Sequence, residues 1–278
     1  MKPGTTMAKL LDRVLLGICV FLLVSPAISV FLWMLSLALK NEVENLAYPP
    51  VFIPSAPTFN NFLTVFRETP FFLYLKNSLI VSGCATLLAL AFGVPAGYAV
   101  ARLKARKLML TILIARMTPA ISFLIPLFTL FQALGLTGTL VPIVITHLVL
   151  TMPITVYILA GYFETLPGEL EEAAVIDGCS PWQSFMHIAV PLARPGITVA
   201  AILAFIFSWN NFIFGAVLAG RTTRTLPVAI YNVLTFEQIA WGPLAAAAIL
   251  VTLPVLLLTL IVQKEIVGGL TAGGVKGG

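Results

Sequence analysis

Charged residues are scarce in this sequence. Of its 278 residues, 10% are charged, whereas 59% are hydrophobic and the mean hydropathy is +1.03. Soluble domains carry about 25% charged residues, so this chain lacks the polar side chains that a water-exposed surface needs. The composition therefore excludes an ordinary soluble domain and predicts an integral membrane protein.

Cysteines and catalytic motifs are also few. The three cysteines, Cys19, Cys84 and Cys179, are too scattered for a disulfide framework or a metal site. The chain contains no GxxxxGK[ST] phosphate-binding motif, no HExxH zinc motif and no nucleophile elbow. We therefore expect no cofactor, no metal ion and no catalysis in this chain. The net charge of +5 is explained by basic loops on one side of a bilayer, so we expect no nucleic-acid partner.

Six segments are apolar and long enough to cross a bilayer, for which a helix needs about 20 residues. They are roughly Val14–Leu39, Asn77–Ala101, Leu108–Ala133, Val141–Phe163, Ile197–Leu218 and Pro243–Val262. The glycines of LGLTGTL (134–140) favour a turn between the third and fourth segments. The first segment exceeds the apolar region of a signal peptide, about 7–15 residues, so we expect a retained helix.

The distribution of Lys and Arg predicts the orientation. If the N-terminus is cytoplasmic, ten basic residues fall on the inner side and five on the outer side, with Arg116 inside the third segment. The inner ten are Lys2, Lys9, Arg13, Arg102, Lys104, Arg106, Lys107, Arg194, Lys264 and Lys276, and the outer five are Lys40, Arg67, Lys76, Arg221 and Arg224. The positive-inside rule thus predicts a multi-pass protein of the cell membrane with both termini in the cytoplasm.

The segments suggest a division into three parts. Residues 1–76 hold a cytoplasmic tail, the first membrane helix and an outer loop, residues 77–263 form the core, and residues 264–278 form a cytoplasmic tail. In the outer loop, the proline-rich stretch YPPVFIPSAPTFNNF disfavours helix and predicts an extended lid against the outer face. The glycine-rich end GGLTAGGVKGG predicts a flexible tail.

The longest inner loop, residues 164–196, is predicted to contain two short helices. The first, GELEEAAVI (168–176), follows Pro167 and carries acidic residues in its first turn, where they favour the helix dipole. Gly178 is expected to end it, because glycine adopts the left-handed conformation of a C-terminal cap.

Ser180-Pro181-Trp182-Gln183 predicts the start of the second helix, because Ser and Gln at this spacing form a capping box. We expect an apolar face of Phe185, Ile188 and Ala189. Pro191 and Pro195 are expected to end this helix before the fifth membrane segment begins.

The loop has two interpretations from its residue types. An amphipathic loop can rest on lipid headgroups, but its first helix is acidic through Glu169, Glu171 and Glu172, and anionic lipids repel such a surface. An acidic helix with alanines on one face fits a groove in a protein partner. The residues favour docking to a partner protein, and contact with membrane lipid is the alternative.

The stretch EEAAVIDGCSPWQSFMHIAVPLARPG (171–196) resembles the EAA loop of binding-protein-dependent ABC importers. The positions that match the family pattern are Glu172, Ala173, Ala174, Asp177, Gly178, Ile188, Pro191 and Leu192. Val190 stands where the family usually has Leu. KNSLIVS (76–82), FSWNNFIFGAVL (207–218), LPVAI (226–230) and VGGLTAGGVKG (267–277) resemble maltose-type, MalG-like carbohydrate permease subunits.

This resemblance implies a fold and a set of partners. The fold is the type I ABC importer (MetI-like) permease fold, all-α with six transmembrane helices. The implied partners are a second permease subunit, two ATP-binding subunits that bind ATP and Mg, and an extracytoplasmic sugar-binding protein. The transported molecule is a sugar such as maltose or trehalose, an oligosaccharide or a polyol. In this family the C-terminal tail, here Gly268–Gly278, also reaches toward the ATPase.

The resemblance also assigns site residues. Contact with the ATPase is expected from Glu172, Ala173, Ala174, Asp177, Gly178, Phe185, Ile188 and Pro191. Within the membrane segments, Arg116 has either a structural role or a role in the pathway. Trp209, Asn210 and Asn211 either line a sugar pathway or form interhelical hydrogen bonds. A stand-alone secondary transporter and an intramembrane enzyme are the alternatives, but the segments lack the carboxylates or catalytic groups that these need.

Overall fold

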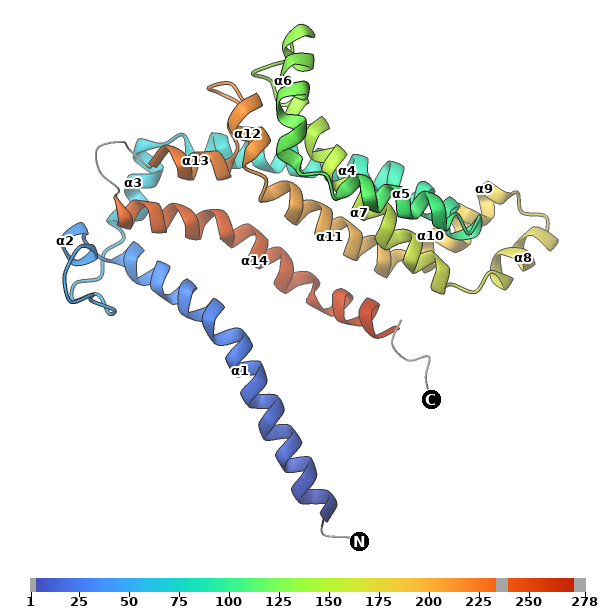
Figure 1. The fold of residues 1–278 in the computed structure, drawn as a ribbon, viewed down its shortest axis with the longest axis horizontal. Coiled ribbons are helices and arrows are strands. Elements are labelled where there is room, and N and C mark those ends of the chain that lie inside the picture. Colours follow the sequence, from blue (N-terminus) through green and yellow to red (C-terminus); the bar gives the residue numbers. More distant parts are fainter. Residues whose placement is uncertain (1–3, 234–239, 273–278) are drawn as a thin grey trace. The chain divides into compact units, whose positions relative to one another are not determined.

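The computed structural model describes residues 4–233 and 240–272, which form helices and connecting turns without a β-strand (Figure 1). The chain divides into two compact units. Unit 1 comprises Met1–Thr69 and Asn232–Leu250, and unit 2 comprises Pro70–Tyr231 and Val251–Gly278. The predicted all-α class is confirmed.

Unit 1 contains α1 (Gly4–Leu39), α2 (Glu42–Asn45), α3 (Asn60–Glu68) and the start of α14 (Trp241–Ala272). Residues 46–59 are not helical, which agrees with the prediction for most of the proline-rich stretch 48–62, but its last three residues, 60–62, belong to α3. This stretch folds back on the end of α1. Lys40 Nζ donates a hydrogen bond of 2.6 Å to the carbonyl oxygen of Val51, and the ring of Phe52 lies 5.1 Å from that of Trp33.

Glu42 of unit 1 caps the first turn of α14. Its carboxylate accepts the backbone N–H of Trp241 at 2.9 Å and that of Gly242 at 3.2 Å. The first N–H groups of a helix have no partner within the helix, and the positive end of its dipole favours a carboxylate. A contact across about 200 positions of sequence therefore fixes where α14 begins.

The core of unit 2 is built from α4 (Phe71–Arg102), α7 (Val141–Thr165) and α11 (Arg194–Trp209), which pack against one another. Glycines on α4 let α4 and α7 approach closely, as small residues commonly do between membrane helices. A Cβ atom on Gly97 would lie 2.8 Å from Cβ of Leu159, so a side chain there forces the helices apart.

Four helices are long and apolar enough to cross a membrane, namely Asp12–Leu39, Phe71–Arg102, Val141–Thr165 and Trp241–Leu260. They correspond to the first, second, fourth and sixth predicted segments. The single helix predicted over Leu108–Ala133 is wrong, because α5 (Arg106–Arg116), the 3-10 turn η1 (Ala120–Phe123) and α6 (Leu124–Ala133) replace it. Pro119 explains the break, since it lacks an N–H donor and disfavours helical backbone at Thr118.

The single helix predicted over Ile197–Leu218 is also wrong. α11 ends at Trp209 and α12 spans Ile213–Leu218, followed by α13 (Leu226–Val233). Asn211 promotes the break, because its side-chain oxygen accepts the N–H of Phe214 at 3.4 Å in place of a helical carbonyl.

The C-terminal tail differs from the prediction in its first part. α14 continues to Ala272, so residues 268–272 are helical where a flexible tail was predicted, and residues 273–278 lie outside the described residues. A single glycine weakens a helix by about 1 kcal/mol relative to alanine, which does not suffice to end it.

Candidate functional site

The loop between α7 and α11, called here the coupling loop (residues 164–196), is the helix–turn–helix that the sequence predicts. Its first helix is α8 (Glu169–Ile176). The second helical stretch consists of α9 (Pro181–Ser184), the π-helical turn η2 (Phe185–Ala189) and α10 (Val190–Leu192). Three of the four carboxylates of α8 and its C-cap are in the first turn, where they favour the helix dipole.

Gly178 ends α8 as predicted. Its φ of +93° is left-handed, its N–H donates to the carbonyl of Val175, and the N–H of Cys179 donates to the carbonyl of Ala174. These two bonds form a Schellman cap. A Cβ atom on Gly178 would meet no atom within 4 Å, so there is room for a side chain. Glycine is required here because of the left-handed backbone conformation.

The predicted capping box at Ser180 is also present. The N–H of Ser180 donates to Gln183 Oε1 at 2.8 Å, and the N–H of Gln183 donates to Ser180 Oγ at 3.3 Å. The second helical stretch ends at Leu192, between Pro191 and Pro195, as predicted. The chain then bends by 74° into α11.

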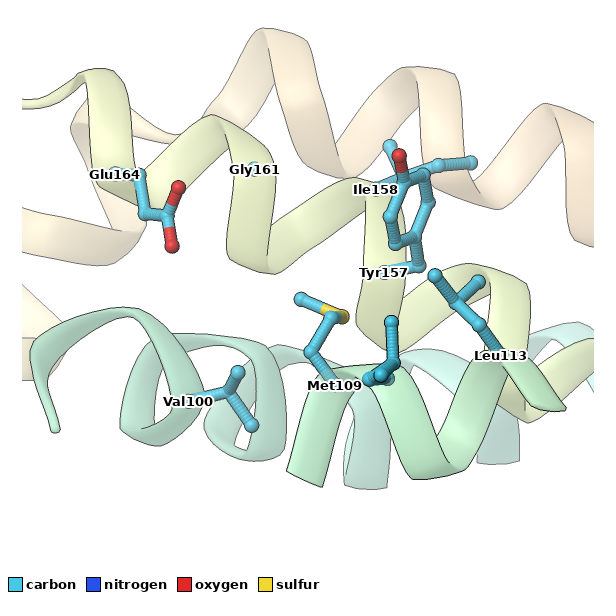
Figure 2. A pocket seen from close by; sticks show the side chains of 8 residues that line it. Val100, Met109, Leu113, Tyr157, Ile158, Gly161 and Glu164 are labelled. Carbon is cyan, nitrogen blue, oxygen red and sulfur yellow. The ribbon is translucent and has the colours of Figure 1, made fainter. Parts of the chain in front are cut away.

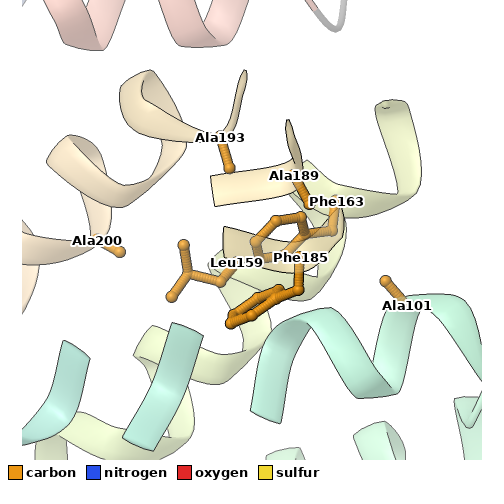
Figure 3. Close-up of a cluster of buried hydrophobic side chains, with 7 residues drawn as sticks. All are labelled: Ala101, Leu159, Phe163, Phe185, Ala189, Ala193 and Ala200. Atoms are coloured by element: carbon orange, nitrogen blue, oxygen red, sulfur yellow. The ribbon is translucent and has the colours of Figure 1, made fainter. Parts of the chain in front are cut away.

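The second helical stretch packs onto the transmembrane core. Phe185, Ala189 and Ala193 are buried in one cluster with residues from three core helices. The other members are Ala101 of α4, Leu159 and Phe163 of α7, and Ala200 of α11 (Figure 3). Phe185, 5% exposed, is therefore a structural contact within unit 2, where the sequence assigned it to the ATPase.

A charged hydrogen-bond network ties α8 to the end of α4. Arg102 Nε donates to Glu171 Oε1 at 3.0 Å and Arg102 Nη2 donates to the same oxygen at 2.5 Å, while Tyr98 Oη donates to Glu171 Oε2 at 2.5 Å. Arg102 Nη1 also donates to the carbonyl oxygen of Phe163 at 3.0 Å. Both side chains of the ion pair are largely shielded, at 26% exposed for Arg102 and 13% for Glu171. This network orients α8 relative to α4 and α7.

The opposite face of the coupling loop is open to solvent. Of the predicted coupling residues, Glu172, Ala173, Asp177 and Gly178 are exposed, Ile188 and Pro191 are half-buried, and Ala174 and Phe185 are buried. Three large apolar side chains lie beside the acidic residues, with Val175 52%, Ile176 85% and Trp182 65% exposed. A surface that combines carboxylates with exposed apolar groups suits a protein partner.

Tyr98, Arg102 and Glu171 were not predicted from the sequence as a group. One local signal existed, because Glu171 lies three residues before Ala174 on α8 and both belong to the face that packs inward. Arg102 lies 69 positions away, and no spacing in the sequence marks that pair.

The pathway candidates lie where two helices break. Arg116 ends α5 with an exposed side chain, and its guanidinium lies 5.4 Å from the ring centroid of Phe207 on α11. Asn210 is exposed and Asn211 is half-buried after the end of α11. Trp209, in contrast, is 1% exposed and donates its indole N–H to the carbonyl of Val251 at 3.0 Å, which is an interhelical contact.

A cavity of about 360 Å³ opens between α4, α5 and α7 (Figure 2). Its lining is mainly aliphatic, through Val100, Met109, Leu110, Leu113 and Ile158, and Glu164 lies at one end. With only Tyr157 and Glu164 as polar side chains, it lacks the convergent hydrogen-bonding groups that a sugar site requires.

Comparison with known proteins identifies the family. Residues 89–267 match the family model described as binding-protein-dependent transport system inner membrane component. The chain belongs to this family. The matched residues include the coupling loop and Arg116.

Curated relatives and a solved structure agree with this assignment. The chain is 38% identical over 178 residues to the sulfoquinovosyl glycerol transport system permease protein SmoH of Agrobacterium fabrum, covering 63% of this chain and 62% of that protein. It is 39% identical over 190 residues to the trehalose transport system permease protein SugB of Mycobacterium tuberculosis, covering 67% of this chain and 69% of that protein. The two alignments thus span about two thirds of those relatives.

The fold matches a chain of a bacterial ABC transporter involved in the import of the acidic polysaccharide alginate. The TM-score is 0.73 at 21% sequence identity, with 95% of this chain and 98% of that chain covered. The fold of an ABC importer permease is therefore confirmed, together with the resemblance to carbohydrate permeases.

Proposed function

We propose that this chain is a membrane-spanning permease subunit of an ATP-driven sugar importer. Together with a second permease it forms the translocation pathway, two ATP-binding subunits dock below it, and an extracytoplasmic binding protein delivers the sugar. The chain itself binds no ATP, Mg or other cofactor and is not catalytic, because the partner ATPase performs hydrolysis.

One observation carries this proposal. In a member of the binding-protein-dependent family, the coupling loop is fastened to the core on one face and presents acidic and apolar side chains on the other. A loop that only covered the bundle would bury its apolar side chains, whereas Ile176 is 85% exposed. The fastened face transmits movement to α4 and α7, and the open face receives the ATPase.

The exposure of each residue divides the predicted coupling residues into those that contact the ATPase and those that hold the loop in place. Glu172, Ala173 and Asp177 contact the ATPase directly, with Ile188 and Pro191 at the edge of the interface. Gly178 sets the path of the turn between α8 and α9, while Ala174 and Phe185 act from inside by holding the loop in place. Trp182 and Ile176 supply the apolar contacts.

The proposed class of substrate, a sugar, is taken from the relatives, which are named as permeases for sulfoquinovosyl glycerol and for trehalose. We place the pathway along the broken helices, at Arg116, Asn210 and Asn211. Irregular backbone at membrane depth is tolerated where it lines a cavity, and amides bind sugar hydroxyls. Family membership favours this assignment over a stand-alone secondary transporter.

The proposed orientation has both termini and the coupling loop in the cytoplasm. It is supported by ten basic residues on that side against five outside. The same orientation places the proline-rich stretch of residues 46–59 on the outer face, where the binding protein arrives.

The test is ATP-driven sugar uptake by the complete transporter reconstituted in liposomes. Replacing Glu172 by Ala, or Gly178 by Asp, is expected to abolish uptake while the variant permease still inserts and co-purifies with the second permease. Glu68→Ala on α3, which removes an exposed carboxylate far from the coupling loop in sequence, is the control and should leave uptake unchanged. Normal uptake by both coupling-loop variants would refute the proposal.

A further inference from the structure

The acidic residues of unit 2 are confined to two places. The sequence of unit 2 contains Glu164, Glu169, Glu171, Glu172 and Asp177 in the coupling loop and Glu265 near the end of α14. Residues 70–163 and 178–231 contain no Asp or Glu at all, although they contain several Lys and Arg residues. The membrane interior and the outer side of unit 2 therefore hold positive charge without any carboxylate to neutralise it.

Arg116, at the end of α5, is one cation of this region. It is ten residues after Arg106, the start of α5, which is about 15 Å along the helix axis. If α5 enters a hydrocarbon core of about 30 Å at its first residue and runs along the membrane normal, Arg116 lies about half-way through it. Its side chain is exposed, and among the residues that the structure describes no carboxylate lies within ion-pair distance of it. An ionisable group at this depth is costly unless it meets a partner.

The surroundings of Arg116 suit a transient ligand. The ring of Phe207 supports the guanidinium at 5.4 Å, which fixes the cation without using its five N–H donors. Phe207 is itself 46% exposed and lies three residues before Asn210, at the break that follows α11. The guanidinium and an aromatic face thus meet near the ends of α5 and α11, and an exposed amide follows in the sequence at the end of α11.

Two more arginines lie on the outer side of unit 2 in a loop that is held rigidly. This arginine loop, residues 219–225, includes Arg221 and Arg224, and Asn77 of α4 donates hydrogen bonds of 2.9 Å to the carbonyls of Thr222 and Arg224. Thr223 Oγ1 donates to the carbonyl of Gly138 at 2.9 Å. These cations raise the local concentration of anions at the outer side.

We propose that the pathway through this chain accepts sugars that carry an anionic group, a carboxylate or sulfonate, and that Arg116 seated on Phe207 binds that group midway. This inference rests on the proposed permease function and names its substrate class. Lipid phosphates do not provide the same anion, because they lie at the membrane surface about 15 Å away.

The test uses the assembled complex of both permeases and the ATPase in nanodiscs, with sodium glucuronate and glucose as matched probes in saturation-transfer difference NMR. The wild-type complex is expected to bind glucuronate more tightly than glucose. Arg116→Gln should weaken glucuronate binding by about tenfold or more, as expected for the loss of a charge-assisted hydrogen-bonded pair, and weaken glucose binding by a much smaller factor. Arg116→Lys should retain part of the affinity, and Arg67→Gln on α3 should have no effect.

Equal binding of the two probes by the wild type, or the same glucuronate affinity in Arg116→Gln, overturns the inference. Absence of glucuronate binding to the wild type also overturns it. If the wild-type complex shows ATP-driven uptake of a neutral sugar and gives any of these three results, the anionic substrate class is rejected and the permease assignment stands.

Discussion

At the C-terminal end of α4, Arg102 meets Glu171 and Tyr98 in a closed network, whereas Arg116 at the end of α5 has an aromatic ring as its one contact among the described residues. Both are arginines at the last turn of a helix in unit 2. The first has its donors occupied by a carboxylate and a backbone carbonyl, which makes a rigid joint. The second keeps its donors available. In the proposed function, charge is paired where the chain transmits force, and in the further inference it is left unpaired where an anionic ligand binds.

The largest expected effect concerns the apolar side of the rigid joint. Phe185→Ala removes a buried ring that lies 4.7 Å from the ring of Tyr98, and should destabilise the coupling loop by about 3–5 kcal/mol, the usual cost of deleting a core aromatic side chain. Limited proteolysis between residues 166 and 193 measures this. Ile176→Ala, which truncates a side chain that is 85% exposed, is the control and should leave the protease resistance nearly unchanged. Equal resistance of the Phe185 variant and the wild type would show that the loop is not held from inside.

A smaller effect is expected from the charged network. Arg102→Ala and Glu171→Ala should each cost about 1.5–3 kcal/mol, because hydrogen bonds to charged groups are lost and the remaining partner stays partly shielded. Faster amide hydrogen exchange in residues 169–176 would show that α8 is less firmly held. A double-mutant cycle isolates the pair, since the double variant should be more stable than the sum of the single costs predicts. Strict additivity would mean that the two side chains do not act together and that the joint lies elsewhere.

The smallest expected effect concerns Asn77, which holds the arginine loop by two hydrogen bonds. Asn77→Ala removes two hydrogen bonds to backbone carbonyls and should cost about 1–3 kcal/mol. We expect faster hydrogen exchange in residues 219–225 with unchanged exchange in the coupling loop. Asn60→Ala, an exposed residue of α3, serves as the control. Unchanged exchange in the arginine loop would indicate that Thr223 alone holds it.

Much of the coupling loop could be predicted because its signals are local. The Schellman cap at Gly178 and the capping box at Ser180 depend on residues a few positions apart, and the structure forms both as predicted. The four long apolar helices likewise follow from composition along a single stretch. The break at Pro119 was also within reach, since the backbone chemistry of proline is local.

Other features depend on contacts between distant residues. Arg102 and Glu171, and also Glu42 and the start of α14, are pairs whose separation in sequence carries no periodic signal. The burial of Phe185, which was predicted to contact the ATPase, was not foreseen for the same reason. A helix pattern shows which residues share a face, but only the packing against α4 and α7 shows which face is turned inward.

The central claim is that the open face of the coupling loop is covered by a separate ATPase. It is tested most directly by maleimide labelling of Ile176→Cys in a background where Cys19, Cys84 and Cys179 are replaced by Ser, with Arg67→Cys as a control position. Assembly of the two permeases with the ATPase subunits should slow labelling at position 176 by about tenfold or more, because an interface excludes water around its core, and leave labelling at position 67 unchanged. An equal labelling rate at position 176 with and without the ATPase would contradict the account.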